Sequence, residues 1–172
     1  QGELAKAEPL LREALGIRQR VYGDDHPDTV NTRNDLTSLL HDQGDLSGAE
    51  PLYRAAVNSL EARLGRDHVD YAGQVNNLAS VLEDQRRFDE AERLYRDSLD
   101  IRRRHYEPEH QSVARAQHNL ARVLLALGRV PEAEALVRAA LATRLKVLPA
   151  GHFETALSKT LLGKVLAARG LA

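Results

Sequence analysis

The segment NNLASVLEDQRRFDEAERLYRDSLDIRRR, residues 76–104, contains two helical patterns joined by a very short connection. The first pattern begins just upstream, and its apolar residues recur along one stripe of a 3.6-residue period. These residues are Ala72, Val75, Leu78, Ala79 and Leu82. The second pattern contains Phe88, Ala91, Leu94, Tyr95, Ser98 and Leu99. The intervening DQRR is too short for anything but a tight turn, so the segment is predicted to form a helical hairpin.

The hairpin is repeated along the chain with a period of 42 residues, marked by histidines at positions 26, 68, 110 and 152. When the segments that begin at Gly2, Gly44, Arg86 and Gly128 are aligned, the same positions hold alanine, glutamate and leucine in all four. A fixed period between about 20 and 50 residues is typical of a solenoid, in which each unit buries its apolar face on its neighbours. The sequence therefore predicts an array of stacked helical hairpins.

One hairpin lacks the glycine that ends the first helix in the others. Gly44, Gly128 and Gly170 stand where a first helix must stop, because a left-handed residue costs a glycine little. Arg86 occupies this position in its hairpin. A residue other than glycine costs on the order of 1 kcal/mol in this conformation. This hairpin is therefore predicted to be strained or closed differently.

The repeated histidines precede the first helix of each hairpin, and they favour a structural role over a metal site. The first turns that follow carry acids suited to a helix N-terminus, such as Asp28 and Asp70, and Pro27 stands where a first helical residue would be. Equivalent histidines are expected about 10–20 Å apart, from the diameter of a helix. Zinc ligands lie about 2 Å from the ion. We therefore expect each histidine to order its junction by packing and hydrogen bonding, with no metal and no cofactor.

The composition favours one ordinary soluble domain with a substantial core. The chain has 172 residues, of which 42% are hydrophobic, and its formal net charge of −1 gives no global attraction to nucleic acid or an anionic membrane. Because cysteine is missing, disulfides and thiolate chemistry are excluded. The apolar runs are shorter than the roughly 20 residues that cross a bilayer. We expect a cytoplasmic protein with no membrane partner.

The sequence offers little for catalysis or nucleic-acid binding. It contains no Gly-rich phosphate loop, no G-x-S-x-G and no H-E-x-x-H. The basic run at residues 101–106 suggests nucleic acid, but Asp97 and Asp100 precede its arginines at helical spacing and favour pairs within one helix. The prediction is that the chain is not an enzyme and has no nucleic-acid partner.

The paired pattern of residues 76–104, with DHPDTV upstream at residues 25–30, resembles the tetratricopeptide repeat (TPR) of the kinesin-light-chain type. Packing positions of that family are occupied by Leu78, Ala79, Phe88, Ala91, Leu94, Tyr95 and Ser98. The resemblance covers essentially the whole chain. It implies an all-α fold, a right-handed superhelix of eight antiparallel helices.

The phase of the repeat divides residues 1–172 into one array with a half repeat at each end. A half repeat at 1–22 is followed by full repeats at 27–64, 69–106 and 111–148 and by a half repeat at 153–169. The sequence contains no methionine and begins inside a repeat. We expect it to be a fragment of a larger protein.

The resemblance implies that the first helices line a concave groove that binds a peptide or protein segment. Polar residues off the apolar stripe of these helices are the candidate contacts: Asn31, Asn34, Ser38, Asn76, Asn77, Ser80, Arg115, His118, Asn119, Arg122 and Lys164. Asparagine side chains can pair with the backbone of an extended ligand. The alternative is that these side chains are solvated or bond to their neighbours.

Charge is uneven along this face, with Asp42, Glu83 and Asp84 early and Arg115, Arg122 and Lys164 later. This pattern suggests a ligand that places acidic groups against the later set. The lysine–asparagine–arginine set with which chaperone-binding tetratricopeptide domains hold a terminal carboxylate finds no full match.

Self-association is the alternative function. In this arrangement of repeats both end helices lack a stacking partner, so their apolar edges are expected to be exposed. Contact between such edges would join copies of the chain end to end.

Overall fold

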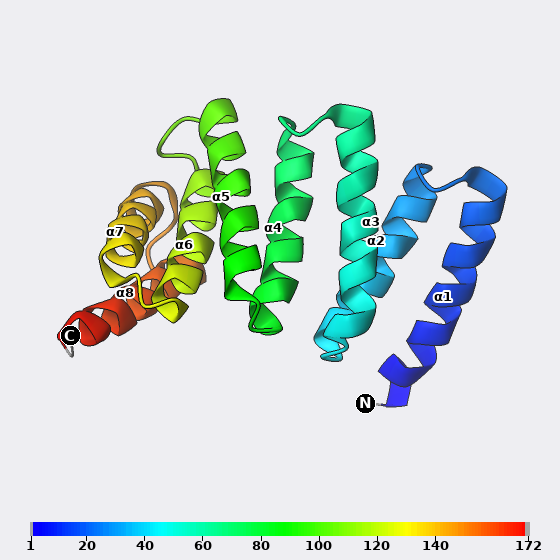
Figure 1. Ribbon diagram of the computed structural model, residues 1–172, viewed down its shortest axis with the longest axis horizontal. Helices are drawn as coiled ribbons and strands as arrows, with labels where there is room; N and C mark the ends of the chain where they lie inside the picture. Colours follow the sequence, from blue (N-terminus) through cyan, green and yellow to red (C-terminus); the bar gives the residue numbers. More distant parts are fainter. Residues whose placement is uncertain (1, 171–172) are drawn as a thin grey trace. The chain divides into compact units, whose positions relative to one another are not determined.

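The computed structural model describes the backbone of residues 2–170 and the side chains from Ala7 onward (Figure 1). Residue 1, part of the first predicted half repeat, lies outside the described residues. Over this range the fold is all-α, with eight helices and no strand. The helices are α1 (Gly2–Tyr22), α2 (Pro27–Asp42), α3 (Leu46–Leu64), α4 (Val69–Asp84), α5 (Phe88–His105), α6 (Gln111–Ala126), α7 (Val130–Val147) and α8 (Phe153–Gly170).

The chain divides into two compact units, Gln1–Arg66 (unit 1) and Asp67–Ala172 (unit 2). Unit 1 contains α1, α2 and α3, and consecutive helices pack against each other. Its core consists of Leu15, Leu36, Leu40 and Ala49, which are buried. The half-buried Leu11, Leu52 and Tyr53 pack against this core. Apolar residues from all three helices therefore hold unit 1 together.

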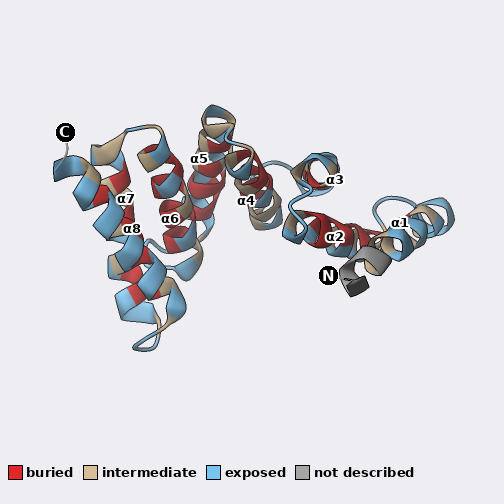
Figure 2. Cartoon of the chain, turned by 90° about the horizontal axis from the view of Figure 1, so that it is seen from below, coloured by how far each residue is buried: buried red, intermediate tan, exposed pale blue. Residues whose placement is uncertain are grey.

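Unit 2 contains α4 to α8, and each helix packs antiparallel to the next (Figure 1). Buried residues lie along the sides of these helices that face their neighbours (Figure 2). The alanine repeated in the second helices is fully buried at Ala91 and Ala133, where its small side chain allows the paired helices to approach closely. Tyr95 and Leu124 are also fully buried. The apolar stripes predicted from the sequence thus form the core of this unit.

The Arg86 hairpin is closed in the same way as the glycine hairpins, but with a strained residue. Arg86 has φ 65°, close to the φ values of 78° at Gly44 and 77° at Gly128. In each hairpin the residue after this position donates its N–H to a carbonyl five residues back, as Arg87 does to Leu82 at 2.8 Å. The prediction of strain is confirmed, and the alternative of a different closure is wrong. The Arg86 guanidinium lies 5.1 Å from the centroid of the Phe88 ring.

All four repeated histidines accept a hydrogen bond at the start of a first helix. Nδ1 of His26, His68, His110 and His152 accepts the backbone N–H of the residue two positions later at 3.1–3.2 Å. The ring of His110 also stacks on Tyr106, with 4.1 Å between the ring centroids. These side chains satisfy a backbone donor that the helix itself leaves unpaired. The predicted structural role is confirmed.

Three arginines connect the end of a second helix to the start of the following first helix. Arg18, Arg102 and Arg144 each donate to the backbone carbonyl ten residues later, at 3.1, 3.5 and 2.9 Å respectively. Arg102 and Arg144 are buried, at 4% and 2% exposed. We call Arg18, Arg102 and Arg144 the junction arginines. They supply directional bonds between successive hairpins inside each unit.

Candidate functional site

The candidate contacts lie on the first helices, α2 in unit 1 and α4, α6 and α8 in unit 2. On α2, Asn31 and Ser38 are exposed and Asn34 is half-buried. This helix therefore presents polar side chains to solvent.

On the first helices of unit 2 the candidate residues differ in accessibility. Asn77, Arg115, Arg122 and Lys164 are exposed, and Ser80 and Asn119 are half-buried. In contrast, Asn76 and His118 are buried, at 9% and 7% exposed. Two of the candidate contacts are therefore shielded from solvent.

Two of the predicted asparagines bond to each other. The amide of Asn119 on α6 donates to Oδ1 of Asn76 on α4 at 3.0 Å. This is the neighbour bonding that the sequence left open as an alternative. The bond joins two first helices side by side and leaves Asn77 as the exposed amide of α4.

Arg122 forms a bidentate ion pair with Glu83, which lies on the preceding first helix. Its Nε and Nη2 donate to the two carboxylate oxygens of Glu83 at 2.6 Å each. Tyr95 donates its hydroxyl to the same carboxylate at 3.0 Å. The acidic and basic residues of this face therefore do not form two separate groups, because Glu83 and Arg122 neutralise each other. The sequence missed this pair because its members are 39 residues apart.

The pKa values of this cluster follow from burial and from the Glu83 charge. Burial raises the pKa of the fully buried Tyr95, and the Glu83 carboxylate raises it further. Burial by itself would lower the pKa of Arg122, but the hydrogen bond and charge of Glu83 outweigh it and raise that pKa. Both groups keep their protons, so the cluster is a fixed structural link between α4 and α6.

Arg115 and Lys164 form no ion pair within the described residues, so they are the cations of this face that remain available. Burial lowers the pKa of both Arg102 and Arg144. The Glu154 carboxylate opposes this shift at Arg144, and the charge of Arg115 adds to it at both residues. Arg115 therefore lies close enough to two buried guanidinium groups for their charges to interact. Part of this positive charge is already balanced, because the Glu154 carboxylate lies 3.9 Å from Nε of Arg144.

His118 belongs to a buried network and does not face solvent. Its Nδ1 lies 3.4 Å from the hydroxyl of Ser158, which accepts from Arg144 at 2.7 Å. Burial, followed by the charges of Arg144 and Arg122, lowers the pKa of His118 to about 4. The imidazole is therefore neutral at pH 7. It links α6 to α8 from inside the unit.

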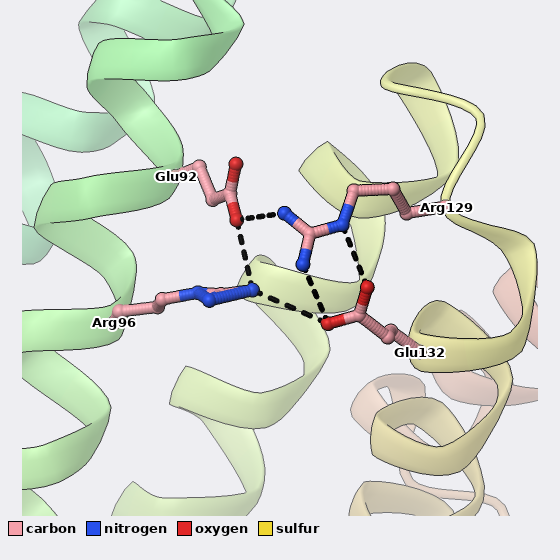
Figure 3. Close-up of polar contacts among 4 residues, drawn as sticks. All are labelled: Glu92, Arg96, Arg129 and Glu132. Carbon is pink, nitrogen blue, oxygen red and sulfur yellow. Dashed lines mark hydrogen bonds and ion pairs between the residues drawn. The ribbon is translucent and has the colours of Figure 1, made fainter.

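A closed ring of four charges lies on the side of the second helices (Figure 3). Arg129 donates to both carboxylate oxygens of Glu132 at 2.7 Å and also pairs with Glu92. Arg96 contacts Glu92 at 2.8 Å and Glu132 at 3.4 Å. This network joins α5 to the start of α7. The Glu92–Arg96 and Arg129–Glu132 pairs have helical spacing in the sequence, whereas the other two links of this network join residues far apart in the sequence.

The exposed large hydrophobic residues lie mainly on α1 and on or around α7 and α8. They are Leu10, Ile17, Val21, Tyr22, Leu64, Leu145, Val147, Phe153, Leu157 and Leu166. One face of α8 is open where the same face of α6 is covered by α7, since Leu166 is 41% exposed and its repeat equivalent Leu124 is fully buried. Lys159 is exposed on that open face, so the face is not purely apolar.

None of the helices in the described range is long and apolar enough to cross a membrane. The same residues contain no group of three or more histidine, aspartate or glutamate side chains placed to hold a metal ion.

Comparison with known proteins identifies the family. The tetratricopeptide repeat family matches residues 1–62 and 70–146. The chain therefore belongs to the tetratricopeptide repeat family, and its similarity to solved structures places it with the kinesin-light-chain-like members. No curated protein matches the chain.

Two of these structures are a kinesin light chain from Podosopora anserina with nearly identical TPR-like repeats and a variant of that same protein. Each is 25% identical, with TM-scores of 0.81 and 0.83. In both cases 99% of this chain is covered, against 81% and 80% of the other. A third is BtubC (BKLC) from P. vanneervenii, with 26% identity and a TM-score of 0.84 over 98% of this chain and 67% of that one. The family generally mediates protein–protein interaction and is typically non-enzymatic.

Proposed function

We propose that this chain is a protein-interaction module that binds a peptide or protein segment on the exposed face of its first helices. The observation that carries the proposal is a set of accessible polar side chains on successive first helices of unit 2. These are Asn77 on α4, Arg115 on α6 and Lys164 on α8. The Asn76–Asn119 and Glu83–Arg122 bonds fix α4 against α6, so a ligand meets preorganised groups. The polar face of α2 is a separate candidate surface in unit 1.

The charges of this face favour a ligand with acidic groups. Arg115 and Lys164 supply positive charge, and the charge of the buried Arg102 adds to that of Arg115, whereas Glu154 lies 3.9 Å from Arg144 and balances its charge. Arg122 contributes little, because Glu83 already neutralises it. An extended ligand would pair its backbone with Asn77 and place a carboxylate near Arg115.

Selection from a random peptide display library on the immobilised chain tests this function. Enriched peptides should carry aspartate or glutamate, and calorimetry should show at least a tenfold loss of affinity for R115E/K164E. Arg93→Glu is the matched control, because Arg93 is an exposed cation on the second helix α5, and its affinity should be unchanged. Equal affinity of R115E/K164E and wild type, or an equal loss in the Arg93 control, would contradict the proposed surface.

Self-association through the end helices is the second candidate. It is favoured by the open face of α8, where Ala156 and Leu166 are exposed although their equivalents Ala114 and Leu124 on α6 are fully buried. Lys159 on this face disfavours a second copy. Light scattering should therefore show a rising mass for K159V if this face joins copies. A monomer at every concentration for both wild type and K159V would remove this candidate.

A further inference from the structure

A pocket of about 320 Å³ lies beside the connection between α7 and α8, within unit 2. Its lining is mostly apolar and includes Leu145 at the end of α7, Leu148 and Ala150 in the connection, and Ala156 and Lys159 on α8. Sites for small ligands begin at about 300 Å³. Among the described residues that line the pocket, Lys159 alone is a lysine, arginine or acid. The pocket therefore combines an apolar wall with one positive charge.

The ammonium group of Lys159 has no acidic partner in the part of the chain that the structure describes. The acids on either side of the connection are already engaged, since Glu109 pairs with Lys146 and Glu154 lies 3.9 Å from Nε of Arg144. Lys159 is itself exposed. A carboxylate placed in the pocket would supply the counter-charge that this lysine lacks.

The connection between α1 and α2, in unit 1, contains such a carboxylate from the chain itself. Oδ1 of Asp24 accepts hydrogen bonds from Gln19 at 2.8 Å and from Arg33 at 2.9 Å. Arg33 lies on the first helix α2 and is only 4% exposed. An acid in the connection therefore neutralises a cation on the helix that follows.

The pocket has the same three repeat positions without the acid. Lys159, Ala150 and Leu145 follow Arg33, Asp24 and Gln19 by three periods of the repeat. The correspondence is one of residue types, since the left-handed glycine is Gly23 in the first connection and Gly151 in this one. The later connection thus keeps the cation, loses the carboxylate and replaces a polar donor with an apolar side chain.

We propose that this pocket binds an acidic side chain of a partner polypeptide. Its carboxylate pairs with Lys159, and an adjacent apolar side chain of the partner packs against Leu145 and Leu148. A free carboxylate alone would leave the apolar lining unused, so the apolar neighbour adds to the affinity. This site is separate from the surface around Asn77, Arg115 and Lys164, and it does not depend on ligand binding there.

Nuclear magnetic resonance titration of the full chain with the amide of acetyl-leucyl-aspartate tests the site. Backbone signals of residues 145–159 should shift. The amide of acetyl-leucyl-asparagine is the matched neutral compound and should bind about tenfold more weakly, as expected when a hydrogen bond between charged groups is lost. Sodium acetate lacks the leucine and should also bind about tenfold more weakly.

Three variants connect the binding to the pocket. Lys159→Gln keeps a long side chain but removes the charge, so it should weaken binding of the aspartate compound about tenfold. Ala150→Asp adds a carboxylate to the same lining, and it should block the compound by competing for Lys159. R115E/K164E changes the other surface and should bind as wild type does. Unchanged backbone signals far from the substituted residues establish that each variant is folded.

Equal binding of the asparagine compound, or unchanged affinity in Lys159→Gln or Ala150→Asp, would overturn the carboxylate site. Acetate that binds as tightly as the aspartate compound would indicate a site for small anions and overturn the polypeptide partner. Loss of binding in R115E/K164E alone would place the compound on the other surface. Signals of residues 145–159 that depend on protein concentration before any compound is added would mean that a second copy occupies the pocket, which also contradicts the proposal.

Discussion

At the scale of the residue, single side chains in unusual positions carry the clearest consequences. Arg86 has a backbone conformation that glycine adopts in the equivalent hairpins, and its cost is partly offset by contact with the Phe88 ring. His118 is a titratable group held in a buried network between α6 and α8. Each is expected to affect the free energy of unfolding.

Arg86→Gly is expected to stabilise the chain by about 0.5–1 kcal/mol, because relief of the left-handed strain exceeds the lost contact with Phe88. Urea unfolding measures the change. Gly128→Arg is the reverse substitution in a hairpin with φ 77° and open space around the added Cβ, so it should destabilise by a similar amount. A less stable Arg86→Gly variant would show that the cation–ring contact dominates.

The pKa of His118 predicts a loss of stability in mild acid. Its folded pKa of about 4 lies below the ordinary value of 6.5, so the unfolded chain binds the proton first. Stability therefore falls as the pH drops from 6.5 toward 4, by about 2 kcal/mol between pH 7 and pH 5 from this group. His118→Gln should remove that part of the pH dependence in urea unfolding at the two pH values. An unchanged pH dependence in the variant would contradict the burial of a neutral imidazole.

At the scale of the element, the helices begin where the repeated histidines supply an acceptor and pack where alanine permits close contact. The N-cap bond at His110 and its stack on Tyr106 act together at the start of α6. Polar links such as Asn76–Asn119 then set the spacing of successive first helices.

His110→Ala should cost about 1 kcal/mol, since the Ser112 N–H loses its acceptor. In this variant the backbone amides in the first turn of α6 should also exchange their hydrogens faster. His110→Asn restores an acceptor without the stacking ring, so it separates the two contributions. Full protection in His110→Ala would mean that the cap contributes nothing to the helix start.

At the scale of the whole molecule, stability is expected to be local to each unit. Unit 1 has its own core around Leu36 and Leu40, and unit 2 has one that includes Leu120 and Leu124. In a repeat array each hairpin depends mainly on its nearest neighbours. The effect of a core substitution should therefore be confined to the unit that contains the substituted residue.

Leu120→Ala should cost about 2–5 kcal/mol, because Leu120 is 3% exposed in the middle of unit 2. Leu162→Ala should cost less, since Leu162 is only half-buried on α8. Hydrogen exchange should show the loss of protection from Leu120→Ala in α4 to α8 and not in α1 to α3. Equal losses at the two positions, or a uniform loss along the chain, would contradict this account.

The sequence was sufficient for the helices but not for the contacts between repeats. Apolar spacing around Leu78 and Leu99, together with the 42-residue period, predicted every helix, because local periodicity determines which face is buried. The Glu83–Arg122 pair and the burial of Arg144 depend on how one hairpin meets the next. No local sequence pattern encodes that geometry. The burial of Asn76 and His118 could therefore not be predicted, and both were included among the candidate contacts.

The four N-cap histidines have a consequence for spectroscopy. Because Nδ1 accepts the helix N–H in each ring, the ring hydrogen must reside on Nε2, so His26, His68, His110 and His152 share one tautomer. Nitrogen chemical shifts distinguish the tautomers, and they give one resonance signature for each connection along the chain. A disturbance confined to a single connection would then be visible as a change in one imidazole while the other three stay constant.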